Sequence, residues 1–291
     1  MKRKSICAVS LLALVLLTAL PLTAFDWPQD EVMSDTFYSY FGQLRGGILS
    51  TSLIFADTSD IKAADNGYIV AIINEYDDDS VFFPSALGNA VILAHGDDLI
   101  TVYGNIDKET IPTSLSIAGK VTTGTVFGSS GNSGWQQGRS SLEFQTIDTA
   151  SGNAVNPRVL MPRVGKELAL SLTGITLEGK DMRYDLLVQR TLPAGLYRVY
   201  RQRQSVAMPY KTRVVVNGIV ADEISYDQLV QNGSVVYAVG RKNYPRGMLY
   251  PDERLQLLGE VTLTPGKNTL GIALTDVLGE VTATSYSLTI Y

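Results

Sequence analysis

Short apolar runs separated by turn-forming residues recur along most of the chain and restrict it to a β-rich fold. Residues 90–94 (AVILA) and 99–103 (LITVY) are typical, since each is as long as a strand. They flank residues 95–98 (HGDD), which predicts a β-hairpin. Helical patterns are scarce, and we expect only a short helix at 31–42 and a single turn at 225–229. The pattern predicts an all-β protein.

Residues 1–24 have the organisation of a secretion signal. Three basic residues at positions 2–4 precede an apolar run at 6–20, and small residues lead up to Ala24. We predict cleavage after Ala24, which leaves a mature chain without a membrane span in the periplasm or at the surface of a bacterium. The alternative is an uncleaved anchor, because the apolar stretch is just long enough to cross a bilayer.

Cysteine content and charge exclude several classes of function. The only cysteine, Cys7, lies inside the leader, so the mature chain has no disulfide framework and no thiol chemistry. The leader also holds three of the 24 basic residues and none of the 29 acidic ones, which leaves a net charge of −8 on the rest. An acidic chain without a basic patch argues against nucleic acid as a partner, and weakly against anionic lipid headgroups.

Prolines and a glycine near residue 165 divide the mature chain into two predicted domains. We expect an N-terminal leader segment over 25–40, a first β domain over 41–164 and a second over 165–291. Closely spaced strands with turn residues between them predict a β-sandwich for the second domain, and its last strands resemble those of bacterial Ig-like domains. The strands expected there are 168–172, 184–188, 195–201, 210–216, 234–240, 254–258, 260–263, 269–274 and 281–290.

Eight short segments of the first domain follow one another in an order typical of a known family. They are Phe41-Gly42 with Arg45, residues 61–69 (IKAADNGYI), 88–96 (GNAVILAHG), 101–106 (TVYGNI), 119–121 (GKV), 131–134 (GNSG), 141–144 (SLEF) and 155–157 (VNP). In this order they resemble the LytM (M23) peptidase domain, a family of zinc endopeptidases that cut peptidoglycan cross-bridges. The resemblance runs from residue 41 to about 162 and implies an antiparallel β-sheet domain with an open groove across the sheet.

The residues that this family uses for zinc binding and catalysis are absent from the chain. The resemblance places the three ligand positions at Ser50, Ile54 and Glu143, and the two catalytic histidines at Asn105 and Ser141. A hydrolytic zinc site needs about three N or O ligands and a metal-bound water, whereas Glu143 would be alone. Ile54 in place of an acidic ligand indicates a filled, dry site. We expect no metal, no cofactor and no peptidase activity.

The groove could bind a ligand without cleaving it, and a polar floor with an aromatic wall suits a sugar or a peptide strand. The resemblance places six residues in this groove: Tyr103, Asn105, Trp135, Arg139, Ser141 and Glu143. The alternative is that Tyr103 and Trp135 only pack in the interior. His95, the only histidine, corresponds to a position that is not a ligand, and we expect it to form local hydrogen bonds within its hairpin.

Three functions are compatible with these observations. The first is a non-catalytic cell-envelope protein that binds peptidoglycan or regulates a cell-wall hydrolase, because degenerate members of the family act as amidase activators. The second is a structural or surface-interaction protein that acts through its C-terminal sandwich, in which case the first domain should fold without residues 165–291. The third is an active M23 metallopeptidase, which would require one equivalent of zinc.

Overall fold

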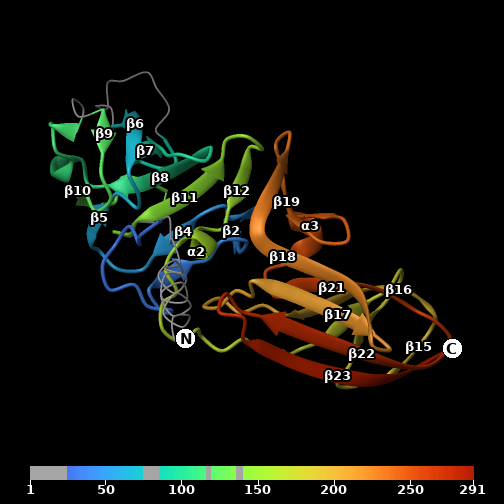
Figure 1. Ribbon diagram of the computed structural model, residues 1–291. Coiled ribbons are helices and arrows are strands. Elements are labelled where there is room, and N and C mark those ends of the chain that lie inside the picture. Colours follow the sequence, from blue (N-terminus) through green and yellow to red (C-terminus); the bar gives the residue numbers. More distant parts are fainter. Residues whose placement is uncertain (1–24, 75–84, 116–118, 136–139) are drawn as a thin grey trace, which may run out of the picture.

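The computed structural model describes residues 25–74, 85–115, 119–135 and 140–291. The predicted signal peptide and Arg139 therefore lie outside the described residues. Strands dominate both lobes of the molecule, which Figure 1 shows in blue to green for the N-terminal lobe and in yellow to red for the C-terminal lobe. The all-β prediction is confirmed. Among the described residues no helix is long and apolar enough to cross a bilayer.

The N-terminal lobe consists of short strands and two brief helical turns. Its elements are β1 (Phe37–Ser39), β2 (Leu44–Arg45), β3 (Ile48–Leu49), β4 (Leu53–Phe55), β5 (Asp60–Lys62), β6 (Gly67–Ile73), β7 (Asn89–Ala94), β8 (Leu99–Ile106), η1 (Lys108–Thr110), β9 (Lys120–Val121), β10 (Val126–Ser129), β11 (Glu143–Asp148), β12 (Asn153–Val155) and α2 (Pro157–Leu160). The predicted hairpin is confirmed as β7 and β8, and its turn residues Asp97 and Asp98 both have positive φ angles, as a two-residue hairpin turn requires.

An antiparallel sheet in the order β9-β6-β7-β8-β11 forms the centre of this lobe. Strand β11 has two partners on its other edge. Its first residues pair with β4, and its last residues pair with β12. This arrangement brings β4, β8 and β11 together, and these three strands carry most of the positions that the family uses for zinc and catalysis.

The C-terminal lobe is a β-sandwich. Its elements are β13 (Thr176–Glu178), β14 (Arg183–Asp185), β15 (Thr191–Leu192), β16 (Gly195–Gln202), β17 (Lys211–Val216), β18 (Ile219–Asn232), β19 (Val235–Val239), β20 (Asn243–Pro245), α3 (Arg246–Leu249), β21 (Leu255–Leu263), β22 (Gly266–Thr275) and β23 (Val281–Ile290). One layer has the order β15-β23-β22-β17-β18 and the other β14-β13-β16-β21, and a core that includes Val199, Val214 and Leu258 lies between them. The sandwich is confirmed, while its Ig-like character stays a prediction.

Three local predictions were wrong. Residues 31–42 contain no helix, because Phe37 and Ser39 point into the core as strand β1 and pair with the edge of β4. Residues 225–229 belong to strand β18 rather than to a helical turn. Residues 168–172 are not a strand, because side chains satisfy their backbone: Gln204 accepts from the Ser171 amide, and Arg201 donates to the Ser171 carbonyl.

Two predicted strands, 254–258 and 260–263, are one strand with a β-bulge. Gly259 has φ +154°, and the register between β16 and β21 shifts at this point. A side chain at residue 259 would meet Asp222, since a Cβ there would lie 3.0 Å from the Asp222 Cβ. Glycine therefore lets the strand bend without ending.

Of the two hydrophobic cores among the described residues, one contains side chains from both lobes. Strand β18 is 14 residues long, and its second half leaves the sandwich to pair with β12, as Ala154↔Leu229 and Val155↔Gln228. The Tyr250 hydroxyl donates to the Gly42 carbonyl at 2.8 Å across the same junction. Removal of residues 165–291 would expose this apolar face to water. We therefore no longer expect the first lobe to fold without the second.

We predict that Leu229→Ala destabilises both lobes in one cooperative transition. Leu229 is fully buried in the shared core, and a buried leucine truncated to alanine costs about 2–5 kcal/mol of unfolding free energy. Urea denaturation followed by far-UV circular dichroism and by tryptophan fluorescence would measure this loss, because Trp27 and Trp135 both lie in the first lobe.

Val235→Ala provides the control, since Val235 lies on the same hairpin but is 41% exposed. We expect a change within about 0.5 kcal/mol. Two separate transitions in the Leu229→Ala variant, with fluorescence unaffected in the first, would contradict a shared core.

Candidate functional site

The sheet brings together three of the positions that the resemblance aligns with zinc ligands and catalytic histidines: Ile54, Asn105 and Glu143. Glu143, the first residue of β11, pairs with Ile54 on β4 and with Gly104 on β8. Asn105 follows Gly104 directly on β8. Positions far apart in the sequence thus lie on neighbouring strands, as the family resemblance implies for residues of one site.

A buried ion pair occupies the centre of this arrangement. The Arg45 Nη1 donates to Glu143 Oε2 at 3.1 Å, and the Ser52 hydroxyl donates to Glu143 Oε1 at 2.8 Å. The side chains are 23% and 9% exposed for Arg45 and Glu143. The second guanidinium nitrogen, Nη2, donates to the Trp135 carbonyl at 3.2 Å. Arg45 therefore supplies the positive charge beside Glu143 and also holds the loop that carries Trp135.

The role of Arg45 could not be predicted from the sequence. It is 98 positions away from Glu143, and nothing in its local pattern shows that the hairpin of β2 and β3 turns towards β11. The residue was recognised only as part of the opening segment that resembles the family. The ion pair is a product of the tertiary structure.

Asn105 is fully buried and acts as a structural link between two loops. Its Nδ2 donates to the carbonyls of Gly131 at 2.7 Å and Ser141 at 2.6 Å, and its Oδ1 accepts from the Gly134 amide at 2.7 Å. Its φ angle of +64° is one that asparagine tolerates better than most residues. An amide in this position fixes the backbone around the site and cannot shuttle a proton.

The other two positions that the resemblance aligns with zinc ligands, Ile54 and Ser50, are both buried. Ile54 is fully buried, as a dry site requires. The Ser50 hydroxyl donates to the Ser52 carbonyl at 3.1 Å. Ser141 is fully buried, and its Oγ has no hydrogen-bond partner among the described residues. Within those residues no three His, Cys, Asp or Glu side chains converge.

Tyr103 is a core residue, and its prediction as a groove residue was wrong. Its ring is fully buried and packs against Phe127 and Phe144, with ring centroids 5.0 and 5.1 Å away. Its hydroxyl accepts from the Ala64 amide at 2.8 Å, and burial raises its pKa above the ordinary value. Large apolar neighbours on both sides explain why it lies inside the sheet packing.

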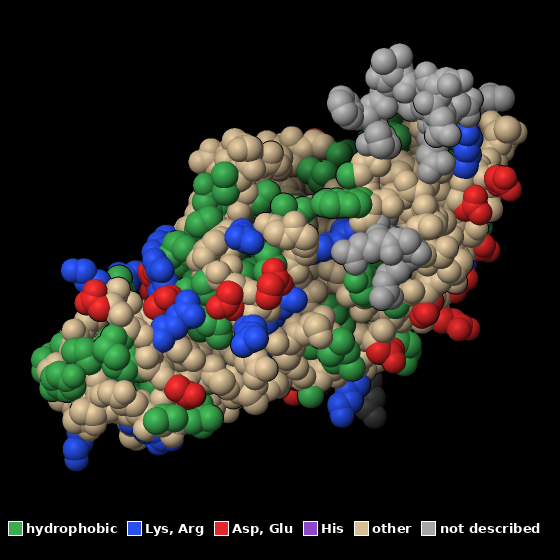
Figure 2. All heavy atoms as spheres, turned by 180° about the vertical axis from the view of Figure 1, so that it is seen from behind, with side chains coloured by type: hydrophobic (Ala, Val, Ile, Leu, Met, Phe, Trp, Pro, Cys, Tyr) green, Lys and Arg blue, Asp and Glu red, His purple; other side chains and the backbone are tan. Residues whose placement is uncertain are grey.

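Only one of the predicted groove residues is well exposed among those that the structure describes. Trp135 has 66% of its surface exposed, whereas Asn105, Ser141 and Glu143 are buried. Arg139 lies outside the described residues. The residues predicted for the floor of the groove are therefore buried, whereas the indole of Trp135 is exposed. Figure 2 shows hydrophobic and basic side chains around a hollow between the two lobes.

His95 forms local contacts, as predicted. Its Nδ1 lies 2.8 Å from the Asn66 carbonyl oxygen, and its Nε2 lies 2.7 Å from the Thr101 hydroxyl. Both ring nitrogens are used within the sheet, so the imidazole holds the β7–β8 hairpin against the turn before β6.

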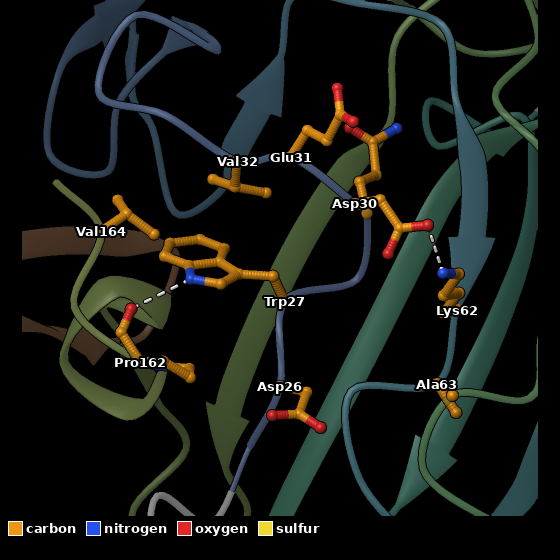
Figure 3. A pocket seen from close by; sticks show the side chains of 11 residues that line it. Asp26, Trp27, Asp30, Glu31, Val32, Lys62, Ala63, Pro162 and Val164 are labelled. Carbon is orange, nitrogen blue, oxygen red and sulfur yellow. Dashed lines mark hydrogen bonds and ion pairs between the residues drawn. The ribbon is translucent and has the colours of Figure 1, made fainter.

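A second hollow, of about 450 Å³, lies where the N-terminal segment crosses the lobe (Figure 3). The Trp27 indole donates to the Pro162 carbonyl at 3.0 Å, and Lys62 forms an ion pair with Asp30. The labelled carboxylates of Asp26, Asp30 and Glu31 make its rim acidic. Trp27 thereby ties the start of the described chain to the segment that leads into the second lobe.

Comparisons with known proteins agree with this architecture. The model of peptidase family M23 matches residues 50–157, and a separate family model matches residues 169–291. An uncharacterized protein of Treponema pallidum (strain Nichols) is 34% identical over 135 residues, which cover 44% of this chain and 89% of that protein.

Several solved structures are similar at low sequence identity. A chain of the SpoIIIAH–SpoIIQ complex is 20% identical over 46% of this chain and 96% of that chain, with a TM-score of 0.36. The catalytic domain of a mutant of the prophage-encoded M23 protein EnpA from Enterococcus faecalis is 24% identical over 42% and 88%, with a TM-score of 0.34. A zinc-containing peptidase from Vibrio cholerae is 18% identical over 49% and 41%, with a TM-score of 0.35.

We predict that Arg45→Met destabilises the protein by about 1–3 kcal/mol, because it removes the ion pair and the hydrogen bond that Arg45 makes with the buried Glu143 carboxylate. Partial exposure of Arg45 keeps the loss below that of a fully buried pair. Urea denaturation of the wild type and the variant would measure the change in unfolding free energy.

The double variant Arg45→Met with Glu143→Gln should recover part of the lost stability, since a neutral amide costs less to bury than a carboxylate. Arg213→Met, which breaks the exposed ion pair with Glu223, should cost less than about 1 kcal/mol. Equal losses for Arg45→Met and Arg213→Met would contradict the role of Arg45.

Proposed function

We propose that the chain is a non-catalytic envelope protein that binds peptidoglycan or a cell-wall hydrolase such as an amidase, since the model of peptidase family M23 matches residues 50–157. The observation that carries this proposal is the Arg45–Glu143 ion pair at the centre of the former zinc site. The protein would be exported to the periplasm or the cell surface by the leader at residues 1–24.

The groups present at the site account for the loss of catalysis. M23-type hydrolysis needs a metal with an open position for water, which the metal acidifies and directs at the peptide bond. Arg45 provides a positive charge but no coordination position, so it can neutralise Glu143 without activating water. Asn105 and Ser141, which take the places of the catalytic histidines, have no ring nitrogen that could transfer a proton near neutral pH.

A binding role is supported by the surroundings of Trp135. Its backbone is fixed on both sides, because its amide donates to the Ala86 carbonyl at 2.9 Å and its carbonyl accepts from Arg45. Its indole is 66% exposed and lies beside Gly46 on the hairpin of β2 and β3. An exposed tryptophan on a fixed backbone, next to an arginine, has the composition of an interface hot spot. Arg45, which pairs with Glu143, therefore also positions Trp135 as a contact residue.

A second candidate function is surface interaction through the C-terminal sandwich. It is favoured by β23, which lies at the outer border of that sandwich (Figure 1), whereas Trp135 belongs to the N-terminal lobe. Binding of peptidoglycan or an amidase by the first lobe and contacts made by β23 are compatible, because the two surfaces do not overlap.

We expect Trp135→Ala to weaken binding about tenfold or more while changing stability little, as is typical of an exposed hot-spot residue. Co-sedimentation of the purified full chain with sacculi would measure the peptidoglycan interaction. Stimulation of an amidase in a mixed assay would measure the other one.

Val188→Ala in the sandwich is the matched control, because Val188 is an exposed apolar residue of the second lobe and should leave both assays unchanged. The proposal fails if neither assay detects an interaction, or if Trp135→Ala behaves like the wild type in both. One equivalent of bound zinc together with cleavage of cross-bridge peptides would restore the peptidase alternative.

A further inference from the structure

Strand β23 is a long edge strand that is left largely uncovered. It pairs with β22 along its whole length, from Val281↔Thr275 to Ile290↔Gly266. On its other side only Thr289 and Ile290 have a strand partner, the two-residue β15. Figure 1 shows β23 at the outer border of the sandwich. Residues 281–287 therefore have no strand partner on that side among the described elements, although Val281 and Thr282 line a hollow of about 500 Å³ together with residues 165–170.

The direction of the open backbone groups follows from the register. The amide of Thr289 donates outwards to the Arg190 carbonyl, and the amide of Tyr291 donates outwards to the Leu192 carbonyl. Because N–H and C=O directions alternate along a strand, the groups of Val281, Ala283 and Ser285 point outwards as well. In the described part of the chain they have no backbone hydrogen bond on that side.

This edge lacks the features that normally keep edge strands apart. Soluble proteins protect such edges with lysines, prolines or bulges. Residues 281–291 (VTATSYSLTIY) contain no charged residue and no proline, and the pairing with β22 continues without a register shift. The residues whose backbone groups point away from β22 have small or β-branched side chains, so another strand can approach closely. They are Val281, Ala283, Ser285 and Ser287. An unprotected edge of this kind fits an extended backbone as its partner.

Opposite charges lie at the two ends of the open edge. Glu280 precedes the first residue of β23, and Arg190 precedes β15 where that strand covers the end of β23. Both are exposed. Arg190 lies over the Tyr286 ring at 5.6 Å and donates from Nε to the Leu186 carbonyl. Neither side chain forms an ion pair within the described residues.

We propose that β23 pairs with β23 of a second copy of this chain, antiparallel about a two-fold axis at Ala283. In that register Val281 of each copy lies opposite Ser285 of the other, and the outward groups of both strands bond in pairs. The same symmetry brings Glu280 of each copy towards Arg190 of the other. The charge pattern therefore matches the strand to itself, which is the reason for choosing a second copy as the partner.

The proposed interface is small, and the net negative charges of the two copies repel each other at long range. Two copies each carry a predicted net charge of −8, and the shared edge involves few residues. We expect a dimer whose population depends on protein concentration. Pairing would continue the five-strand layer β15-β23-β22-β17-β18 across the axis and leave Trp135 of both copies free.

Sedimentation velocity of the full chain, purified after export, tests the proposal. We expect a monomer–dimer equilibrium in the wild type. Ala283→Pro removes an outward amide without removing a bond to β22, and it should weaken association about tenfold or more. Ala283→Ser keeps the amide and should dimerise like the wild type. Circular dichroism establishes that both variants fold.

Charge reversal provides a test that does not depend on proline. Glu280→Arg alone and Arg190→Glu alone should each weaken the dimer, since each places like charges together, and the double reversal should restore it. A wild-type chain that stays monomeric overturns the proposal. This holds even if the strand of another protein binds to the edge of β23. The proposal is also overturned if the dissociation constant of the dimer is unchanged both by Ala283→Pro and by the charge reversals.

Discussion

The pairing of β12 with the far end of β18 is the constraint on which the rest of the structure depends. It joins a sheet of the first lobe to a layer of the sandwich, and it brings Tyr226 and Leu229 into the core that also contains Phe41. Short strands bury little apolar surface by themselves. The first lobe is built almost entirely from such strands, so its core is completed by side chains from the second lobe.

This joint also determines the surroundings of the former zinc site. The hairpin of β2 and β3, which carries Arg45, lies between the first lobe and residues of the second: Arg203 donates to the Leu44 carbonyl, and Gln43 donates to the Ser205 carbonyl. Arg45 is thereby held where its guanidinium reaches Glu143. A buried carboxylate is costly without a cation. An arginine and a serine hydroxyl together meet that requirement here without any metal.

The same interactions connect structure to the proposed binding role. Arg45 joins Glu143 to the backbone of Trp135, and Asn105 fixes the loops on either side. These hydrogen bonds make the surroundings of Glu143 a rigid support for the exposed Trp135 side chain. A side chain on a rigid backbone loses less conformational entropy on binding than one on a flexible loop.

The sequence by itself determined the all-β class, the β7–β8 hairpin, the sandwich and the resemblance of the first lobe to M23 peptidases, because strand periods, turn residues and motif order are local properties. It also predicted that the positions aligned with the zinc ligands hold Ser50, Ile54 and Glu143, since that is a matter of residue identity. Only the tertiary structure decided that Tyr103 is a core residue, that β18 crosses between lobes and that Arg45 pairs with Glu143. These depend on contacts between positions far apart in the chain, such as the 98 that separate Arg45 from Glu143, and no local pattern encodes which distant side chain will lie opposite.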